Sequence, residues 1–346
     1  MRKNLLLFLF LAFILFNTHI ASQNFHNALN SSDINPTPPI LLKSSRYTST
    51  AIPGFTPQIQ KNPSLLGRIA FIAQNDAGET RRYLYVMNAD GSSLILLKTA
   101  LIAAQTDVSL PQLSPSGQDM LFVQYPTHIE FSSLGNHATQ NVLLPSGAVF
   151  ASWSSDGAYL FVTTFPDGSI HQVSLERSSE SSSSYVTIVK GTEDKLALYP
   201  SVSPDGKYMT FVVTGSNSVT LNIIKLEGRE FPIQIDSTDI TTVTNDVDPG
   251  YCAWLSDGSR FIYMGSKGII SVSPEDISSK KSIKTNGDLE FDTRGGLAIS
   301  PDNKYLLFAG YNKPTSTTNL YLLDLLSSNT ALMISNASQP SWVGGK

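Results

Sequence analysis

Six carboxylate or carboxamide side chains stand at similar distances before a recurring large apolar residue. Asp248, for example, lies six residues before Trp254, and Asp292 lies seven residues before Ile299. The members of this acidic set are Asp107, Asp194, Asp246, Asp248, Asp292 and Asn336. Carboxylates that are brought together bind a cation such as calcium, or the basic end of a peptide. Aspartate is also frequent in loops because it suits turns, so a purely structural role is the alternative.

No catalytic motif accompanies these residues. The sequence contains no Gly-x-Ser-x-Gly, no Gly-x-Gly-x-x-Gly, no Gly-x-x-x-x-Gly-Lys-Ser/Thr and no His-Glu-x-x-His. We therefore predict no catalytic residue, and no cofactor apart from calcium as an alternative occupant of the acidic set. His128, His137 and His171 are expected to be ordinary strand and loop residues, with a metal site as the alternative. The single cysteine, Cys252, excludes an intramolecular disulfide and is expected to be a buried, inert thiol.

The elements that position the acidic set are sequence repeats. Five segments carry a turn of the type Ser-Pro-Asp-Gly, with Ser203–Gly206 as the fullest example, and the last residues carry a partial sixth. The large apolar residues that align in them are Leu113, Trp153, Val202, Trp254, Ile299 and Trp342. The intervals between neighbouring members run from 40 to 52 residues. Such intervals are typical of propeller blades.

A β-rich run follows each turn, and two more follow before the next repeat begins. Because Ser-Pro-Asp-Gly favours a tight turn, the two runs that flank it are expected to form a hairpin. In the repeat that contains Ser203–Gly206, the later strands are expected at Met209–Val213, Thr220–Ile224 and Pro232–Ile235, with a loop over Asp236–Pro249. Each repeat is therefore predicted to be a four-stranded antiparallel sheet, and no segment shows a helical period.

The two ends of the repeated region complement each other. Its first run, Gly67–Ile72, matches a second strand, and the missing first strand of that blade is expected at Pro340–Val343. The predicted fold is therefore all-β, a closed six-bladed propeller over residues 67–346 in which the C-terminal strand completes the first blade. An open array of hairpins is the alternative, and it does not account for this complementarity. The aligned tryptophans are expected to pack between blades.

These repeats resemble the WD40-like propeller repeats of the TolB family. The likeness lies in the Ser-Pro-Asp-Gly turn followed by a β-run, and in the turn Asn88–Gly91 after Tyr83–Met87. The resemblance implies a six-bladed, exported propeller that docks onto a protein partner. TolB proteins also carry a small α/β domain before the propeller. Residues 23–66 are too few and too rich in proline to form it, so contacts made through that domain are not implied.

The first residues have the features of an export signal. Arg2 and Lys3 precede the apolar run Leu5–Phe16, and small and polar residues follow as far as Ser22. This order is typical of a secretory signal peptide, and a helix of this length is too short for the alternative, a membrane anchor. We expect a cleaved signal peptide over residues 1–22 and an arm or linker rich in Pro, Ser and Asn over residues 23–66. The protein is then periplasmic or secreted, with no integral membrane segment.

Charge and composition argue against nucleic acid as a partner. The formal net charge is -4 and only 15% of the residues are charged, which gives no basic field for nucleic acid. The leading hypothesis is a non-catalytic, monomeric scaffold that binds a protein or peptide, with the acidic set at one mouth of the central channel. The alternatives are a propeller enzyme that acts on glycans or peptides through dispersed channel residues, and a cell-surface or structural module.

Overall fold

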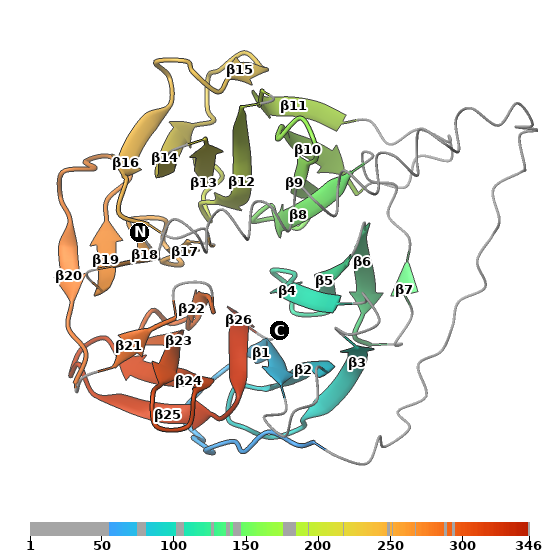
Figure 1. Ribbon diagram of the computed structural model, residues 1–346, viewed down its shortest axis with the longest axis vertical. Helices are drawn as coiled ribbons and strands as arrows, with labels where there is room; N and C mark the ends of the chain where they lie inside the picture. Colours follow the sequence, from blue (N-terminus) through green and yellow to red (C-terminus); the bar gives the residue numbers. More distant parts are fainter. Residues whose placement is uncertain are drawn as a thin grey trace, which may run out of the picture. The chain divides into compact units, whose positions relative to one another are not determined.

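A computed structural model places six small β-sheets in a ring, and each sheet is one blade of a propeller (Figure 1). The structure describes residues 55–74, 81–101, 107–125, 128–135, 139–140, 147–175, 185–192, 194–216, 218–247, 250, 252–266, 268–286, 289–292 and 295–344. These residues form strands, turns and loops, and none of them lies in a helix that could span a membrane. The predicted all-β, six-bladed fold is confirmed.

The first three blades are built outward from an inner strand near the centre of the ring (Figure 1). Blade 1 consists of β26 (Ala337–Val343), β1 (Arg68–Gln74), β2 (Arg81–Asn88) and β3 (Ile95–Leu101). Blade 2 consists of β4 (Asp107–Leu113), β5 (Asp119–Tyr125), β6 (His128–Ser133) and β7 (Thr139–Gln140). Blade 3 consists of β8 (Ala148–Trp153), β9 (Tyr159–Thr164), β10 (Ile170–Ser174) and β11 (Tyr185–Lys190), with the short β15 (Ile233–Gln234) added outside β11.

The other three blades follow the same plan. Blade 4 consists of β12 (Lys195–Val202), β13 (Tyr208–Gly215), β14 (Ser218–Lys225) and β16 (Thr241–Thr244). Blade 5 consists of β17 (Ala253–Trp254), β18 (Phe261–Gly265), β19 (Gly268–Val272) and β20 (Lys281–Ile283). Blade 6 consists of β22 (Leu297–Ile299), β23 (Tyr305–Asn312), β24 (Thr317–Asp324) and β25 (Thr330–Ile334), and β21 (Glu290–Phe291) pairs with the far end of β23.

The fourth strand of blade 4 is not where the sequence predicted it. The predicted segment, Pro232–Ile235, contains β15, which pairs in parallel with β11 of blade 3. The fourth strand is β16, inside the segment that was expected to be a loop. The reason lies in burial: Ile233 and Ile235 are both 6% exposed in the apolar cluster between blades 3 and 4, so β15 covers that interface. The β-branched run Thr241–Thr244 then supplies the missing strand.

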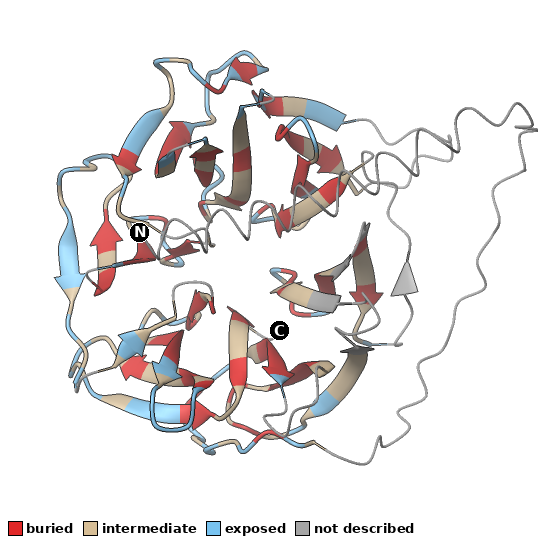
Figure 2. Ribbon diagram, viewed as in Figure 1, coloured by how far each residue is buried: buried red, intermediate tan, exposed pale blue. Residues whose placement is uncertain are grey.

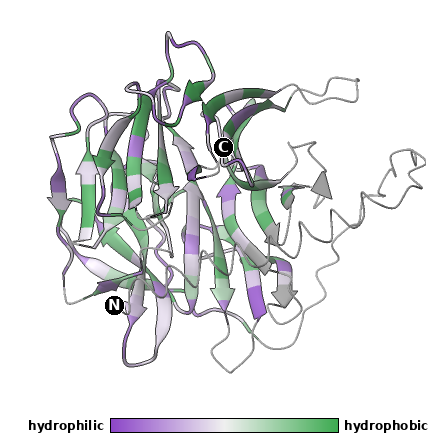
Figure 3. Cartoon of the chain, turned by 45° about the horizontal axis from the view of Figure 1, so that its top comes forward, coloured by the Kyte–Doolittle hydropathy of each residue, from purple (hydrophilic) through white to green (hydrophobic). Residues whose placement is uncertain are grey.

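Apolar side chains fill the space between neighbouring blades. The described residues form six apolar clusters, and each one joins residues of two adjacent blades. Hydrophobic residues follow the strands and hydrophilic residues gather in the turns (Figure 3). Burial is highest on the middle strands of the blades, such as β1 and β13 (Figure 2). The indole nitrogen of Trp153 donates to the carbonyl oxygen of Gln112 in blade 2 (3.0 Å), and that of Trp254 donates to Ser201 in blade 4 (3.2 Å). The predicted packing of tryptophan between blades is thus confirmed.

The repeated turn is held by its own serine and aspartate. Ser203 Oγ donates to Asp205 Oδ1 (2.6 Å) and accepts the backbone N–H of Tyr208 (2.9 Å), which locks the start of β13. The same pair of bonds recurs at Ser154 with Asp156. The hydrogen bond from Ser154 lowers the pKa of Asp156. These aspartates therefore serve the turn that sets the blade.

The C-terminal strand closes the ring as the sequence predicted. β26 pairs with β1 in antiparallel register, with Ile69 opposite Trp342, and it begins earlier than expected, at Ala337. Gln339 contacts both neighbouring blades: its backbone N–H donates to Gly295 of blade 6, and its side-chain oxygen accepts the N–H of Leu110 in blade 2 (2.8 Å). One strand thus joins three blades.

The residues before β1 run along the outside of blades 1 and 6. Ile59 forms an isolated antiparallel bridge with Ile334 at the end of β25, and Gln60 donates its N–H to the carbonyl oxygen of Met333 (2.8 Å). The hydroxyl of Tyr85 donates to the carbonyl oxygen of Phe55 (2.8 Å). An extended segment therefore covers part of the outer edge of blade 6.

Candidate functional site

The segments that lead into the inner strands, here called the inner-strand loops, carry the acidic set. Because every blade repeats the same meander, these loops are expected to lie on one face of the ring. Asp194 is exposed directly before β12, Asp246 precedes β17, Asp292 lies between β21 and β22, and Asn336 lies between β25 and β26. Asp107 is the first residue of β4, where its backbone pairs with Tyr125, and its side chain lies outside the description. Asp248 lies outside the described residues.

Two of the aspartates tie an inner-strand loop to the neighbouring hairpin of the same blade. Asp292 accepts the hydroxyl of Thr318 at Oδ2 (2.7 Å) and the N–H of Gly295 at Oδ1 (3.1 Å). Asp246 accepts the N–H of Ser266 at Oδ1 (3.2 Å). These bonds fix the positions of the two carboxylates.

Asn336, at the equivalent position in the loop before β26, makes its hydrogen bonds through the backbone. Its φ of 53° is left-handed, a conformation that asparagine tolerates better than most residues. Its N–H donates to Asn319 Oδ1 (2.8 Å), and its carbonyl oxygen accepts the N–H of Gln74 (2.9 Å). The backbone of Asn336 therefore shapes the turn into β26.

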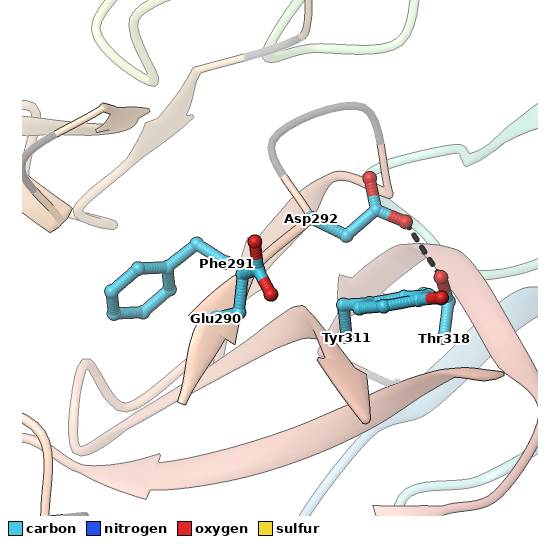
Figure 4. A pocket seen from close by; sticks show the side chains of 5 residues that line it. All are labelled: Glu290, Phe291, Asp292, Tyr311 and Thr318. Carbon is cyan, nitrogen blue, oxygen red and sulfur yellow. Dashed lines mark hydrogen bonds between the residues drawn. The ribbon is translucent and has the colours of Figure 1, made fainter. Parts of the chain in front are cut away.

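The structure brings Asp292 together with residues that the acidic set did not include. An open pocket with a volume of about 300 Å³ is lined by Glu290, Phe291, Asp292, Tyr311 and Thr318. Figure 4 shows the carboxylates of Glu290 and Asp292 near the ring of Tyr311, while the ring of Phe291 points away from them. The Tyr311 side chain is 36% exposed, and Glu290 forms a surface ion pair with Lys313 at 3.2 Å.

Glu290 and Tyr311 escaped the sequence reasoning because they lie outside the repeat alignment. Glu290 belongs to β21, an additional strand in blade 6, and Tyr311 lies near the end of β23. One signal was available: the stretch from β20 to β22 is longer than the turn that a blade needs at this point, and it contains the acidic and aromatic triplet Glu290–Asp292.

The described part of the chain contains no assembled metal site. There, no three His, Cys, Asp or Glu side chains come together in a way that could hold a metal ion. The convergence of the full acidic set stays a prediction, because the side chains of Asp107 and Asp248 are not among those described. Of the other candidates, His128 begins β6 and His137 lies outside the described residues.

His171 and Cys252 occupy buried, structural environments. The ring nitrogens of His171 lie 3.0 Å from Thr164 Oγ1 and 3.1 Å from Thr187 Oγ1. Burial lowers the pKa of His171, and the carboxylate of Asp167 opposes this shift only in part. Burial also raises the pKa of the Cys252 thiol to about 12, so the thiolate nucleophile is not available at neutral pH.

This chain resembles known proteins in its three-dimensional structure. No family model matches the sequence, and no curated protein matches it either. TolB from Acinetobacter baumannii matches with a TM-score of 0.59 and 16% identity, over 81% of this chain and 67% of that chain. A putative TolB from Agrobacterium tumefaciens matches with a TM-score of 0.51 and 16% identity, over 79% of this chain and 91% of that chain.

Propellers of other kinds match as well. A chain of a nidogen/laminin complex has a TM-score of 0.56 at 9% identity, with 80% of this chain and 98% of that chain covered. A prolyl endopeptidase has a TM-score of 0.50 at 13% identity, with 81% of this chain and only 50% of that chain covered. At such identities the likeness carries the fold and no activity. In fold, this chain is a TolB-like six-bladed β-propeller.

Proposed function

We propose that this chain is a non-catalytic binding scaffold that receives a basic segment of a protein partner at the pocket of blade 6. The observation that carries the proposal is the composition of that pocket, in which Glu290, Asp292 and the exposed ring of Tyr311 lie together. A lysine or arginine side chain fits this combination, because carboxylates pair with its charge and the aromatic face adds a cation–π contact.

The hydrogen bonds of the pocket support this role. Asp292 is held by Thr318 and Gly295, so its carboxylate needs little reordering when a cation arrives. Glu290 has only Lys313 as an ion-pair partner among the contacts described, and both side chains are more than half exposed. Exposed ion pairs contribute about 0–1 kcal/mol, so a partner's cation can displace Lys313 at little cost.

The experiment is a binding measurement with a defined set of probes. An array of ten-residue peptides that differ in their content of lysine and arginine is incubated with the full chain, with Glu290→Gln and with Asp257→Asn. The last variant is the matched control, because it removes one turn carboxylate that belongs to the repeated turn of blade 5. Lysine- and arginine-containing peptides are expected to bind best, with affinity that falls about tenfold in Glu290→Gln and weakens with salt.

Two outcomes contradict the proposal. Binding that is independent of lysine and arginine would exclude the cation as the recognised group, and binding unchanged in Glu290→Gln would place it elsewhere. Calcium is tested in parallel as the other occupant of the acidic set: a rise in melting temperature with calcium chloride that is lost in Asp248→Asn would assign the set to the metal.

We also propose that the chain is exported. It is supported by the charged start, the apolar run Leu5–Phe16 and the small residues that follow. N-terminal sequencing of the protein recovered from its producing cells is expected to begin near residue 23. A mature chain that still begins at Met1 would contradict export by cleavage.

A further inference from the structure

Among the described residues, a strand covers only a third of the outer edge of blade 3. β11 has six residues, and β15 pairs with two of them, Val189 and Lys190. The N–H of Ile235 adds a bond to the carbonyl oxygen of Lys190 (3.0 Å). Within the described part of the chain, no strand pairs with the outer side of Tyr185–Ile188. The rest of this edge therefore presents backbone groups in a form that can pair with another chain.

The uncovered part of β11 carries apolar side chains in solvent. Tyr185 is 50% exposed and Val186 is 53% exposed, and the end of β11 that bears them is drawn as exposed in Figure 2. Large apolar side chains that stay exposed beside an open strand edge are the features that proteins usually avoid or cover.

A groove between blades 3 and 4 adjoins this edge. Its volume is about 440 Å³. Its lining combines the apolar residues Phe161, Ile188, Leu226 and Phe231 with Gln172 and with the charged residues Asp205, Lys207 and Glu227 of blade 4. In the strand pairing, Phe161 lies opposite Gln172, and Gln172 lies opposite Val186. Residues directly opposite one another share a face of the sheet, so Val186 extends the groove to the open edge.

We propose that the uncovered edge of β11 binds an extended peptide segment of a partner protein, which continues the line of β15 and places an apolar side chain over the groove. The strand that already covers part of the edge indicates the occupant: β15 is itself an extended segment, and because it runs parallel to β11 it begins beside Val189, next to the uncovered residues. Blade 6 repeats the arrangement, since the extended residue Ile59 bridges Ile334 at the edge of β25. Blades of this propeller thus accept extended chains at their outer edges.

The peptide's side chains follow from the geometry of a strand. Successive side chains point to opposite faces, so every second residue lies on the face of Val186 and Gln172. Beside it are Phe161, which is 5% exposed, Ile188, which is 1% exposed, and the ring of Phe231. An aliphatic or aromatic residue fits there, while main-chain hydrogen bonds supply affinity without regard to sequence. The expected ligand is therefore a short segment with alternating apolar residues.

This site is separate from the pocket of Glu290 and Asp292, since it lies at the outer edge of blade 3 and the pocket lies in blade 6. Each proposal fails or stands by its own variants. Glu290→Gln is expected to leave binding at β11 unchanged, and Val186→Lys is expected to leave binding of basic peptides at blade 6 unchanged.

The probe is a library of random seven-residue peptides displayed on phage and selected on the full chain. Selected peptides are expected to alternate apolar and polar residues, and a synthetic copy is expected to slow amide hydrogen exchange at Tyr185–Ile188. Val186→Lys should weaken its binding about tenfold or more, because it replaces an apolar contact at the open strand edge with a charged side chain. The matched control is Leu332→Lys, which changes an exposed residue (41%) on the outer strand of blade 6 and should have no effect.

The exchange measurement uses the unaltered chain, so it decides the matter even if a variant folds poorly. Selected peptides that leave exchange at Tyr185–Ile188 unchanged would overturn the proposal. It would also be overturned if these amides were already protected without peptide and the chain were a dimer by light scattering, because the edge would then belong to a second copy of this chain.

Discussion

Deleting Gln339–Lys346 is expected to abolish cooperative folding of the propeller, because blade 1 loses most of its inner strand. The deletion removes the strand pairs of Val343 with Arg68, Trp342 with Ile69 and Ser341 with Ala70. What remains of β26 is too short to hold the first blade against blades 6 and 2.

The size of the effect follows from the groups removed. Trp342 is 7% exposed in the cluster between blades 6 and 1, and truncating such a residue to alanine alone costs about 3–5 kcal/mol. Three hydrogen-bonded groups also lose their partners: the carbonyl of Leu66, which accepts Trp342 Nε1–H (2.9 Å), and the N–H groups of Leu110 and Leu113. Of these groups the N–H of Leu113 is buried, and a buried group left unpaired costs about 1–3 kcal/mol. Together these losses are of the same order as the whole stability of a domain, about 5–15 kcal/mol.

Urea denaturation followed by circular dichroism measures the effect in three steps. Leu326→Ala is the control, because Leu326 is 96% exposed and its loss should leave the midpoint unchanged. Trp342→Phe should keep much of the packing and lose the indole hydrogen bond, which lowers the free energy of unfolding by about 1–3 kcal/mol. The deletion should show no cooperative transition. A truncated chain with the slope and midpoint of the intact protein would refute the closed ring as the source of stability.

Three further predictions concern single side chains. The free energy of unfolding should fall as the pH drops below about 6.5, because His171 is protonated at a higher pH in the unfolded chain than in the folded chain, where its pKa is lowered. Urea denaturation at pH 7.5 and 5.5 measures this fall, which should be smaller in His171→Gln. Cys252 should resist iodoacetamide at pH 8 in the native protein and react in guanidinium chloride, and labelling at equal rates in both would contradict its burial. Ser203→Ala should lower the free energy of unfolding by about 1–3 kcal/mol, since it leaves the buried N–H of Tyr208 without its acceptor; an unchanged urea midpoint would exclude that role.

Sequence reasoning recovers the parts of the structure that every blade repeats. The closure of the ring followed from complementary ends, and the pairing of β26 with β1 confirms it. The position of the tryptophans between blades followed from their shared place in the repeat, and the indole bonds of Trp153 and Trp254 confirm it. Both features depend on local turn chemistry and apolar periodicity, which a single sequence displays directly.

Features that depend on contacts between distant residues were not recoverable. Pro232–Ile235 has the composition of a strand, but nothing in its neighbourhood reveals that blade 3 offers a better partner than blade 4. The hydrogen bonds that Asp246 and Asp292 accept likewise depend on where Ser266 and Thr318 lie in the folded blade. A spacing rule identifies a residue at a loop position, whereas the bonds that the residue makes are decided by tertiary structure.

The departures from the repeat coincide with the candidate binding sites. Residues that follow the repeat, such as Ser154 and Asp156, form hydrogen bonds with one another within the turn. The two sheets with five strands are those of blades 3 and 6. The pocket of blade 6 is lined by both residues of its extra strand, β21, and the groove beside blade 3 is lined by Phe231, close before its extra strand, β15. Insertions change the surface of a blade, and here they also add apolar residues to the packing between blades, such as Ile233 of β15 and Phe291 of β21. Binding specificity in this propeller is therefore expected to reside in β15 and β21 and the residues around them.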